Sequence, residues 1–535
     1  MKKRIVAALM SLAIASAAVV GCGAGESTGS AAPEAEAVQE AAGEDAEETA
    51  EAAETAAAAE DVDFSDGGDP LELKLVMVQS GTREGWDEIE EKINEITSEE
   101  IGVVVDVDWI EIGNWNQQIG LRMSSGEQMD LIHMAPFMSF ASLMSTNQLL
   151  DITAELEEYG QDILRIDAPY MDSVKVGGSY YGVPNYFPKG ASIFLEMRTD
   201  TLEELGLTEA AANIKTWDDY AKILEAVRDN TDYRPLQTKG MTGYGTTYAG
   251  RGDFRSENFA EATSIEGLGD PYGLIHVDPE TNKVYSYYQS DIFKKDCERA
   301  ADYYSRDLLY KDGATDQEST LMSSNLYFSF FNCTETLFAE ETIEAESDGL
   351  DITFIEMTPV PLDRSTANLW GFGVPYTCAY PEAAVAFLNL MFTNEELANL
   401  FTWGIEGRDY TVNENGSAQR TENTQYFNIA FFMPNAVIPH SSRVNVDNYQ
   451  AIAEQAIADQ EYSKFMAFDC DIDPINNELT ACYNAKMQYM PALICGSNSD
   501  WEAQFDEFQK KLDENGMQEI LAYYQEQVDA FLAAQ

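Results

Sequence analysis

The stretch Leu71–Val78, with the sequence LELKLVMV, opens the pattern that decides the fold. It predicts a strand, and residues 86–96 follow with tryptophan and isoleucine at helical spacing and glutamates between them. Residues 103–109 (VVVDVDW) alternate as a half-buried strand does. A second helix is predicted over residues 115–123 and a third strand over residues 129–134. This order of strands and helices is typical of a parallel α/β sheet.

The ends of two of these strands carry polar and aromatic residues. Ligands of open α/β sheets bind at the carboxyl ends of the strands. Those ends are residues 79–83 (QSGTR) and residues 133–137 (HMAPF). We therefore expect one wall of a binding site there.

A second α/β region follows the first. Residues 177–184 (GGSYYGVP) are glycine-rich and aromatic and lead to a predicted strand over residues 191–197. A helix is predicted after Thr216, with Thr216 and Asp219 as its capping box. Later predicted elements are strands over residues 352–355 and 369–375, a helix beginning at Pro381, and helical spacing from Trp501 to Leu532. We expect the strand and helix near residues 350–400 to rejoin the first unit, which makes two lobes with a cleft between them.

The N-terminus has the pattern of an export signal. Lys2, Lys3 and Arg4 precede an apolar run from Ile5 to Val20, and Gly21-Cys22 follows. The apolar run is too short to span a bilayer comfortably as a helix. The alternative interpretation is a plain secretory signal that contains a chance cysteine.

Residues 22–69 predict a disordered acidic tether. Between Cys22 and Asp69 there is no Lys, Arg or His, and large apolar side chains are almost absent. Such a segment cannot bury enough surface to offset its chain entropy. Alanine and glutamate favour the alternative of a helix, but repeated like charges oppose it.

The charge of the chain restricts its partners. Its 535 residues carry 32 basic and 94 acidic side chains, a net charge of −62. Such a surface repels nucleic acid and anionic lipid, which leaves neutral or cationic small molecules. The length predicts two domains. With 27 Tyr, 25 Phe and 7 Trp, the chain has enough aromatic side chains to fill cores and line a cleft.

The sequence gives little support to enzymatic chemistry. The three histidines, His133, His276 and His440, do not have metal-ligand spacing. There is no phosphate-binding Gly-Lys-Ser/Thr loop and no Gly-x-Ser-x-Gly elbow. Carboxylate pairs for glycoside hydrolysis carry no signal in so acidic a chain. Six cysteines follow Cys22 and fit either disulfides or buried thiols: Cys297, Cys333, Cys378, Cys470, Cys482 and Cys495.

Several motifs together give a resemblance to a known family. Val19–Cys22 is similar to the lipobox of bacterial lipoproteins. Gly178–Pro184 fits a G-x-x-Y-G-x-P motif, and Pro381–Leu388 fits P-E-A-A-x-x-F-L. Trp403–Tyr410 contains G-I-E-G-x-x-Y, and Phe468–Pro474 fits a Phe-Asp-x-Asp-x-x-Pro loop. The chain resembles the extracellular solute-binding proteins of bacterial ABC sugar importers (family 1), in the lipoprotein subgroup with a C-terminal domain of unnamed function.

The resemblance implies a two-lobe α/β fold of the periplasmic-binding-protein type (type II) with a hinge between the lobes. It implies a monomer, lipid-anchored through Cys22 to the outer face of the cytoplasmic membrane of a Gram-positive cell, which delivers a neutral oligosaccharide to permease subunits. Together with the element order it predicts these boundaries: signal peptide 1–21, tether 22–69, N-terminal lobe 70–187 and 350–402, and C-terminal lobe 188–349 and 403–535.

Sugars present flat apolar faces and a rim of hydroxyl groups, so a binder needs aromatic platforms flanked by polar side chains. The predicted ligand-binding residues lie at strand ends or hinges: Gln79, Arg83, Trp115, Asp130, Phe137, Tyr186, Trp370 and Trp403. Trp370 leads this group because it lies on a predicted lobe-crossing strand, whereas Trp86 and Trp217 are assigned to helix cores. For Glu406, a role in its turn is favoured over one as a ligand acceptor.

Three alternatives remain at this point. The chain could be a surface glycan-processing enzyme with similar anchoring, or an importer subunit for a peptide or an amino sugar. Asp469, Asp471 and Asp473 suggest calcium, but Pro474 stands where a helix–loop–helix calcium site needs glycine. A structural loop is therefore the favoured interpretation, without cofactor or metal. The tripeptide Arg251-Gly252-Asp253 is too short a match to carry a function.

Overall fold

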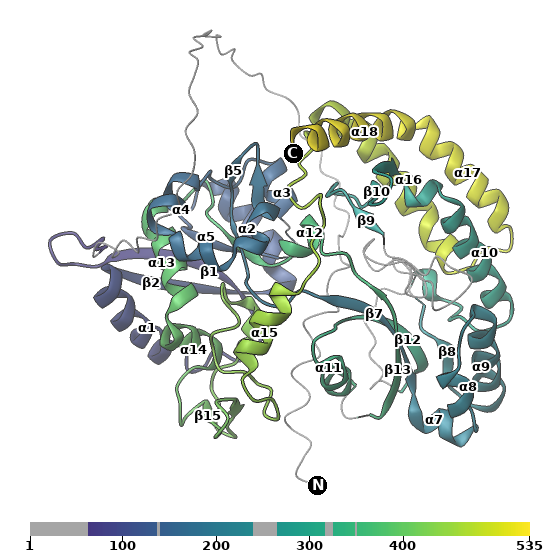
Figure 1. The fold of residues 1–535 in the computed structure, drawn as a ribbon, viewed down its shortest axis with the longest axis horizontal. Helices are drawn as coiled ribbons and strands as arrows, with labels where there is room; N and C mark the ends of the chain where they lie inside the picture. The colour runs from purple at the N-terminus through teal and green to yellow at the C-terminus, as the bar shows by residue number, and fades with distance from the viewer. Residues whose placement is uncertain (1–61, 136–137, 139, 239–264, 316–324, 348–349) are drawn as a thin grey trace.

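The computed structural model describes residues 62–135, 138, 140–238, 265–315, 325–347 and 350–535. Cys22, Phe137 and the tripeptide at residues 251–253 lie outside this range. Figure 1 shows two lobes side by side, with the short helix α12 (Arg364–Ala367) between them. The predicted two-lobe α/β architecture is therefore confirmed.

The first lobe is built on a five-stranded sheet of order β2-β1-β3-β14-β6. Strand β1 (Leu71–Gln79) runs parallel to β2 (Val103–Glu111) and to β3 (Leu131–Met134). Strand β14 (Gly371–Gly373) is antiparallel both to β3 and to β6 (Val183–Pro184). The parallel unit predicted from residues 71–134 is confirmed, and β14 is the strand that returns to it.

Helices of the first lobe pack against this sheet and bury one apolar face each. The predicted helix near residues 86–96 is α1 (Trp86–Ile101), and Trp86 is buried edge-on against Trp109, with ring centroids 5.0 Å apart. Gly102 ends α1 in the left-handed region at φ 68°, where a side chain would be strained. The other helices and short strands are α2 (Trp115–Ser125), α3 (Phe140–Ser145), α4 (Thr153–Tyr159), α5 (Gln161–Ile166), α6 (Ala168–Met171), β4 (Lys175–Val176), β5 (Ser179–Tyr180), α13 (Pro381–Thr393) and α14 (Glu395–Trp403).

The glycine-rich motif before the second lobe has a steric explanation. A Cβ atom on Gly371 of β14 would lie 2.6 Å from the Val183 carbonyl oxygen, and one on Gly182 would lie 3.0 Å from the Phe372 carbonyl oxygen. The first distance is shorter than real Cβ contacts and the second is tighter than most of them, so glycine at these positions lets β6 and β14 pair closely.

The second lobe contains a four-stranded sheet of order β13-β7-β12-β8. Strand β7 (Ala191–Arg198) lies between β13 (Ile352–Pro359) and β12 (Tyr327–Glu335), antiparallel to both. Strand β8 (Arg234–Leu236) is parallel to β12. The predicted strand near residues 352–355 therefore belongs to this sheet and not to the first lobe. The prediction that this strand rejoins the first lobe is wrong, because a strand pattern does not specify which sheet the strand joins.

Helix α9 (Trp217–Asn230) covers one face of the second sheet, and its predicted capping box is confirmed. Thr216 accepts a hydrogen bond from the Asp219 N–H, and Asp219 accepts one from the Thr216 N–H. Trp217 is buried in the core of this lobe, as predicted. Two short helices, α7 (Thr199–Glu204) and α8 (Thr208–Ala212), precede it, and α11 (Ala339–Glu346) follows β12.

A separate core joins the end of the chain to an earlier segment. Its buried residues come from residues 265–297 and residues 465–528. We call residues 265–290 together with residues 464–534 the C-terminal unit. Its elements are β9 (Glu266–Gly267), β10 (His276–Asp278), β11 (Lys283–Tyr285), α16 (Asn476–Ile494), α17 (Trp501–Glu514) and α18 (Met517–Ala534), which pack beside α10 (Asp291–Ser305). The helical spacing predicted after Trp501 thus forms two helices.

Residues 404–458 differ from the predicted C-terminal lobe. Tyr426, Phe432 and Val437 are buried in the core of the first lobe, together with the strands β1 and β3. Helix α15 (Tyr449–Ala458) contributes two further residues of the same core, Ala453 and Ile457. The hairpin of β15 (Tyr410–Val412) and β16 (Ala418–Arg420) lies in the same stretch. The boundary predicted at residue 403 is therefore too early, because aromatic side chains from loops complete the first core.

The beginning of the described chain also packs on the first lobe. The Phe64 N–H donates to the Ile101 carbonyl oxygen at 3.0 Å, and the Phe64 ring lies 5.5 Å from that of Tyr159. The tether predicted to end at residue 69 thus overlaps the fold, because Phe64 finds an apolar partner.

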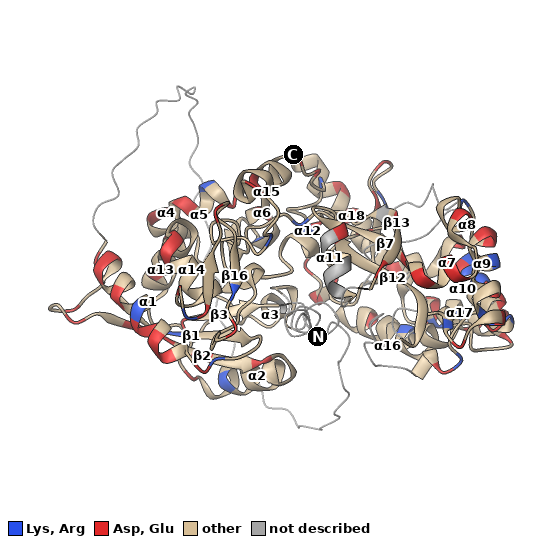
Figure 2. Ribbon diagram, turned by 90° about the horizontal axis from the view of Figure 1, so that it is seen from below, with Lys and Arg blue, Asp and Glu red and all other residues tan. Residues whose placement is uncertain are grey.

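The structure describes all six cysteines after Cys22, and they form no disulfide bonds with one another. No helix in the described part of the chain combines the length and the apolar character that crossing a bilayer requires. Acidic residues are spread over the helices of both lobes, and basic residues are fewer (Figure 2).

Candidate functional site

Within the described ranges, the chain passes between the two lobes along residues 185–190, 359–362 and 459–464. We call these three stretches the crossings. A bridge pairs Leu362 of the second crossing with Tyr462 of the third, and the Gln460 amide of the third accepts from the Lys189 and Gly190 N–H groups of the first. The crossings therefore lie close together, as a hinge requires, and the surfaces on either side of them form the candidate site.

A buried network holds the crossings to each other. The Tyr170 hydroxyl donates to the Phe187 carbonyl oxygen at 2.9 Å. The Gln460 amide satisfies both of its atoms when it donates to the Tyr170 hydroxyl at 2.8 Å and accepts from the Lys189 and Gly190 N–H groups at 2.8 and 2.7 Å. Residues of the first and third crossings are thereby joined to α6.

Two ionisable side chains, Lys189 and Asp167, are buried at the hinge. Lys189 is only 7% exposed, and its ammonium donates to the Ala367 carbonyl oxygen. Burial lowers the pKa of Lys189 to about 7, against the opposing effect of Asp167. Burial also raises the pKa of Asp167, and Lys189 opposes that shift. Both groups lose water on folding, so each favours its neutral form.

His133 fixes the end of β3. Its Nδ1 accepts from the Val78 N–H at 3.1 Å, and its Nε2 lies 2.9 Å from the Phe432 carbonyl oxygen. A carbonyl only accepts, so the proton is on Nε2 and the ring is neutral. Complete burial lowers the pKa of His133 to about 3. The imidazole thus joins β1 and β3 to residues 404–458, which we call the returning segment, and this is a structural role.

Arg83 is predicted to bind ligand, but in the structure its guanidinium contacts side chains and carbonyl oxygens of the first lobe. Its guanidinium lies 3.9 Å from the centre of the Trp109 ring and 4.8 Å from that of Tyr426. It donates to the Phe427 carbonyl oxygen, and to that of Thr82 at 3.2 Å. The side chain therefore closes the loop after β1 onto the returning segment.

Two more predicted residues are wholly buried. Trp115 is 0% exposed and packs in the first core, 6.4 Å from the ring of His133. Asp130 is also 0% exposed and accepts from the Lys74 and Ala379 N–H groups at 2.8 and 2.9 Å. Both differ from their predicted place at the ligand, because core packing and backbone hydrogen bonds occupy them.

Trp403 and Glu406 belong to a turn anchored by Asp409. The Trp403 Nε1–H donates to the His440 carbonyl oxygen at 2.7 Å, and Trp403 is 5% exposed. The carboxylate of Asp409, buried completely, accepts from the Ile405 N–H at 2.9 Å and from Arg408 at 2.7 Å. The G-I-E-G motif is thus a structural turn, which Arg408 ties to Glu88 of α1 at 2.5 Å.

A hollow of about 590 Å³ lies on the first lobe beside this turn and is lined by Lys92, Glu395, Glu396, Asn399, Leu400, Gly404, Ile405, Glu406 and Tyr410. None of these residues belongs to a crossing. The hollow is therefore separate from the hinge, and the site is better placed where both lobes contribute.

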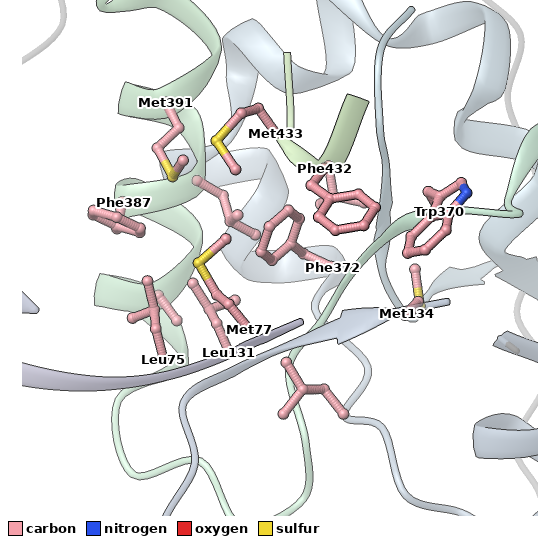
Figure 3. Close-up of a cluster of buried hydrophobic side chains, with 14 of the residues drawn as sticks. Leu75, Met77, Leu131, Met134, Trp370, Phe372, Phe387, Met391, Phe432 and Met433 are labelled. Atoms are coloured by element: carbon pink, nitrogen blue, oxygen red, sulfur yellow. The ribbon is translucent and has the colours of Figure 1, made fainter. Parts of the chain in front are cut away.

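On the first lobe, aromatic rings gather next to the first crossing. Trp370 is 7% exposed, and its ring lies beside that of Phe432 (Figure 3), at 4.6 Å, and 5.7 Å from that of Phe431. Phe187 and Phe431 are half-buried, with ring centroids 6.0 Å apart. Tyr186, also predicted, is 9% exposed and pairs with the returning chain through its backbone.

The sequence prediction missed Phe187 and Phe431. They are far apart in the chain and neither lies in a periodic element, so only the fold brings them together. The one available signal was the Phe431-Phe432 pair in an otherwise irregular stretch. Gln79, at the end of β1, is half-buried, and its amide donates to the Gly81 carbonyl oxygen at 3.1 Å.

The second lobe offers a mixed polar and aromatic sheet face. Ile193, Leu195 and Met197 of β7 pack in the core with α9, so the alternate residues lie on the other face. Figures 1 and 2 place α8 and α9 on the outer side of this sheet, which turns that other face toward the first lobe. Phe194 and Phe354 meet there edge-on at 5.9 Å.

Polar groups accompany these rings. The Ser192 hydroxyl donates to Glu356 at 2.6 Å, and Asn332 lies opposite Phe194 in the register. Phe330, Asn332 and Phe354 are partly exposed. The two lobes therefore present aromatic surfaces with amide and carboxylate neighbours on either side of the hinge.

The acidic loop near residue 470 is a structural loop. Asp469 accepts from Arg364 at 3.0 Å, and Asp471 accepts from the Asp473 N–H at 3.0 Å. In the part of the chain that the structure describes, no cluster of three or more His, Cys, Asp or Glu side chains could hold a metal ion.

The fold and the hinge define a class: a two-lobe α/β protein whose lobes are joined by several chain crossings. The chain belongs to the bacterial extracellular solute-binding proteins, because that family model matches residues 91–418, more than half of its length. A second model, described as a domain of unknown function, matches residues 464–533.

Known relatives agree with this assignment. A carbohydrate ABC transporter substrate-binding protein from Streptococcus pneumoniae serotype 4 is 21% identical over 476 residues, which are 88% of this chain and 92% of the relative. Among solved structures, the N-glycan transport solute binding protein NgtS from Streptococcus pneumoniae is similar with a TM-score of 0.73 and 18% identity, over 86% of this chain and 99% of that one.

A second solved structure extends the comparison. FusA, another substrate-binding protein of an ABC transporter from Streptococcus pneumoniae, in complex with kestose, has a TM-score of 0.55 and 15% identity, over 87% of this chain and 100% of that one. At these identities the likeness establishes the fold alone.

Proposed function

We propose that this protein is the lipid-anchored substrate-binding component of an ABC importer and captures a neutral oligosaccharide between its lobes. Membership of the solute-binding family carries the proposal. It is supported by the names of two relatives, a carbohydrate ABC transporter substrate-binding protein and an N-glycan transport solute binding protein, and by the aromatic surfaces on both sides of the hinge.

The chemistry of the two walls favours a neutral sugar. Phe187 and Phe431 on one lobe and Phe354 on the other offer flat apolar faces of the kind on which sugar rings stack. Asn332 and Glu356 supply an amide and a carboxylate for hydroxyl groups. Lys189, Arg83 and Arg364 are held by the fold, so an acidic sugar would lack a free cation among these residues.

The anchoring part of the proposal rests on the N-terminal sequence. Cys22 would carry the lipid and residues after it would form the tether, at the outer face of the cytoplasmic membrane of a Gram-positive cell. A binder confined near its permease works at high local concentration, so a modest affinity suffices. Loss of membrane association in a Cys22→Ser variant, with labelled fatty acid as the second readout, tests this part.

A glycan-processing enzyme is the competing function. The two are separated by calorimetric titration of the full-length chain with a panel of neutral oligosaccharides that includes kestose and Man5GlcNAc, followed by chromatography of the sugars. We expect one class to bind with one site per chain and to be recovered intact. Turnover of the bound sugar, or binding of none of the panel, contradicts the proposal.

The aromatic wall has its own test. Phe431→Ala should weaken binding of that sugar by about 1 kcal/mol, because a stacked ring is lost. Trp370→Ala, at the ring beside it, should weaken binding by a similar amount. Tyr380→Ala changes an exposed aromatic of the same lobe away from the crossings and serves as the control. If all three variants bind the sugar with the same affinity, Phe431 and Trp370 do not belong to the site.

A further inference from the structure

Arg364 lies where the chain has just returned to the first lobe. It is the first residue of α12, whose start is fixed by Asp363, because the Asp363 carboxylate accepts from the Thr366 N–H at 2.9 Å. Ala367 at the end of α12 is buried in the first core, and Asn368 donates to the Ser173 carbonyl oxygen at 2.8 Å. The backbone that carries Arg364 therefore belongs to the first lobe.

The guanidinium of Arg364 bonds to two parts of the molecule at once. Toward the first lobe, it donates to the carbonyl oxygens of Ser173 at 3.0 Å and Lys175 at 2.8 Å. Toward the C-terminal unit, it donates to the Phe468 carbonyl oxygen at 2.6 Å and to the Asp469 carboxylate at 3.0 Å. One planar group with fixed donor directions thus spans the boundary between the two parts.

This contact is mostly shielded from water. The Arg364 side chain is 12% exposed, and that of Asp469 is 38% exposed. Phe468 is buried in the core of the C-terminal unit, so its carbonyl oxygen is fixed to that core. A shielded guanidinium that loses part of its acceptors leaves donors unsatisfied, which is costly. Moving the acceptors of Arg364 away from its guanidinium therefore costs free energy.

The C-terminal unit itself is attached to the second lobe. Helix α10 contributes Cys297 to the core of the unit and Ala300 and Tyr303 to the core of the second lobe. Gly496, at the end of α16, has φ 62° and approaches Ala300 so closely that a Cβ atom would lie 2.0 Å from the Ala300 carbonyl oxygen. The unit must therefore move with the second lobe.

From these contacts we propose that the C-terminal unit is a strut that sets the angle between the lobes, with Arg364 as its joint to the first lobe. A rotation of the lobes changes the distance between Ser173 and Phe468, which Arg364 bridges. Wide opening breaks one half of its hydrogen bonds. The proposal gives a role to the domain of unknown function, and it does not depend on which ligand is bound.

The third crossing adds to the joint. The Ser463 N–H donates to the Leu362 carbonyl oxygen at 3.0 Å, and the Ser463 hydroxyl donates to Glu266 of β9. The stretch that leads to Phe468 is thereby held against the second crossing. Arg364 consequently acts on a segment whose path is already fixed, so its loss changes the lobe angle more than the path of the chain.

The test is a distance measurement between the lobes of the full-length chain, without ligand. Spin labels are attached through a noncanonical ketone amino acid at Glu157 of α4 and Glu209 of α8, both exposed, so that the free thiols stay unlabelled. Pulsed electron resonance then gives the distribution of distances. We expect Arg364→Ala to broaden this distribution and shift it to longer distances, and Arg364→Lys to shift it less.

Arg306→Ala is the matched control, because Arg306 pairs with Glu225 and Asp302 within the second lobe. It should leave the distribution unchanged. If Arg364→Ala fails to fold, Asp469→Asn removes only the carboxylate charge and should give a smaller shift in the same direction. Folded Arg364 and Asp469 variants with the wild-type distribution overturn the proposal, as does an equal broadening in Arg306→Ala.

Discussion

The hydrophobic cores of the first lobe and of the second lobe are assembled in different ways. The first has one large core, to which segments from residue 73 to residue 466 contribute, and a small cluster of Trp403, Tyr410 and Ala418. The second has two cores, one on its sheet and one in the C-terminal unit, with α10 in both. A single core made of distant segments needs specific connections to close it, whereas two smaller cores can respond separately to a change.

Those connections in the first lobe are buried polar groups. His133 and Arg83 join the early strands to the returning segment, and Asp409 holds parts of that segment together and fixes Arg408, which pairs with Glu88 of α1. The second lobe also has long-range polar contacts, but each stays within one part of it: Lys486 donates to the Tyr272 carbonyl oxygen inside the C-terminal unit, and Tyr220 pairs with Ser329 on the sheet. The comparison predicts that polar substitutions destabilise the first lobe most, and that changes in the second lobe stay local.

Asp409→Ala should have the largest effect. The substitution leaves Arg408 without its buried partner and the Ile405 and Gln425 N–H groups without an acceptor. We expect a loss of about 3 kcal/mol in the free energy of unfolding. Denaturant titration with tryptophan fluorescence measures it, since five of the seven tryptophans lie in the first lobe. If Asp409→Ala lowers the free energy of unfolding less than Thr216→Ala does, polar contacts do not stabilise the first lobe more than the second.

Gly371→Ala should rank second. A Cβ atom at this position would lie 2.6 Å from the Val183 carbonyl oxygen, and backbone cannot move aside cheaply. We expect a cost of about 2 kcal/mol from overpacking. Gly113→Ala, where a Cβ atom meets nothing within 4 Å, is the control. Equal melting temperatures for the two variants would contradict the close approach of β6 and β14.

His133 predicts a dependence of stability on pH. Its pKa is about 3 in the folded chain against an ordinary value of 6.5, so the unfolded chain binds the extra proton between these values. The free energy of unfolding therefore falls as the pH drops below 6.5, by up to about 1.4 kcal/mol per pH unit. In His133→Gln this contribution disappears, and the difference in slope from wild type between pH 6.5 and 5 measures it.

His440→Gln is the control for that slope, because His440 is partly exposed. The slope of this variant should match that of the wild-type chain. A His133→Gln variant whose slope equals the wild-type slope would show that His133 is not held neutral by the first core.

Thr216→Ala should have the smallest effect. It removes the side-chain cap of α9, and we expect a loss of about 1 kcal/mol. Hydrogen exchange should increase in the first turn of α9 and stay unchanged in the first lobe. Increased exchange in β1 or β3 would mean that the second lobe does not respond locally, and would remove the contrast between the lobes.

The parts of the fold that were predictable are those with a local signal. The periodicity of residues 71–134 gives the first sheet, and Thr216 with Asp219 gives a capping box. The placement of β13 was not predictable, because its alternation fits either sheet. Residues 404–458 lack periodicity, so their return to the first core is invisible in the sequence.

The candidate site was predictable only in outline. Strand ends and crossings were expected to hold it, but Arg83 and Asp130 are occupied by backbone groups more than 200 residues away along the chain. Residue type cannot distinguish a polar group that binds ligand from one that closes a fold. Phe187 and Phe431 become neighbours only through the crossings. The resemblance to known binding proteins predicted the function better than any single residue did.

The proposed function requires the two lobes to close on an oligosaccharide. Small-angle X-ray scattering tests it most directly, on the full-length chain with and without a saturating amount of the sugar that binds in the calorimetric panel. We predict that the bound sugar reduces the radius of gyration, because the lobes rotate toward each other about the crossings. An unchanged radius of gyration with the sugar fully bound would contradict the account, since the sugar would then lie outside the space between the lobes.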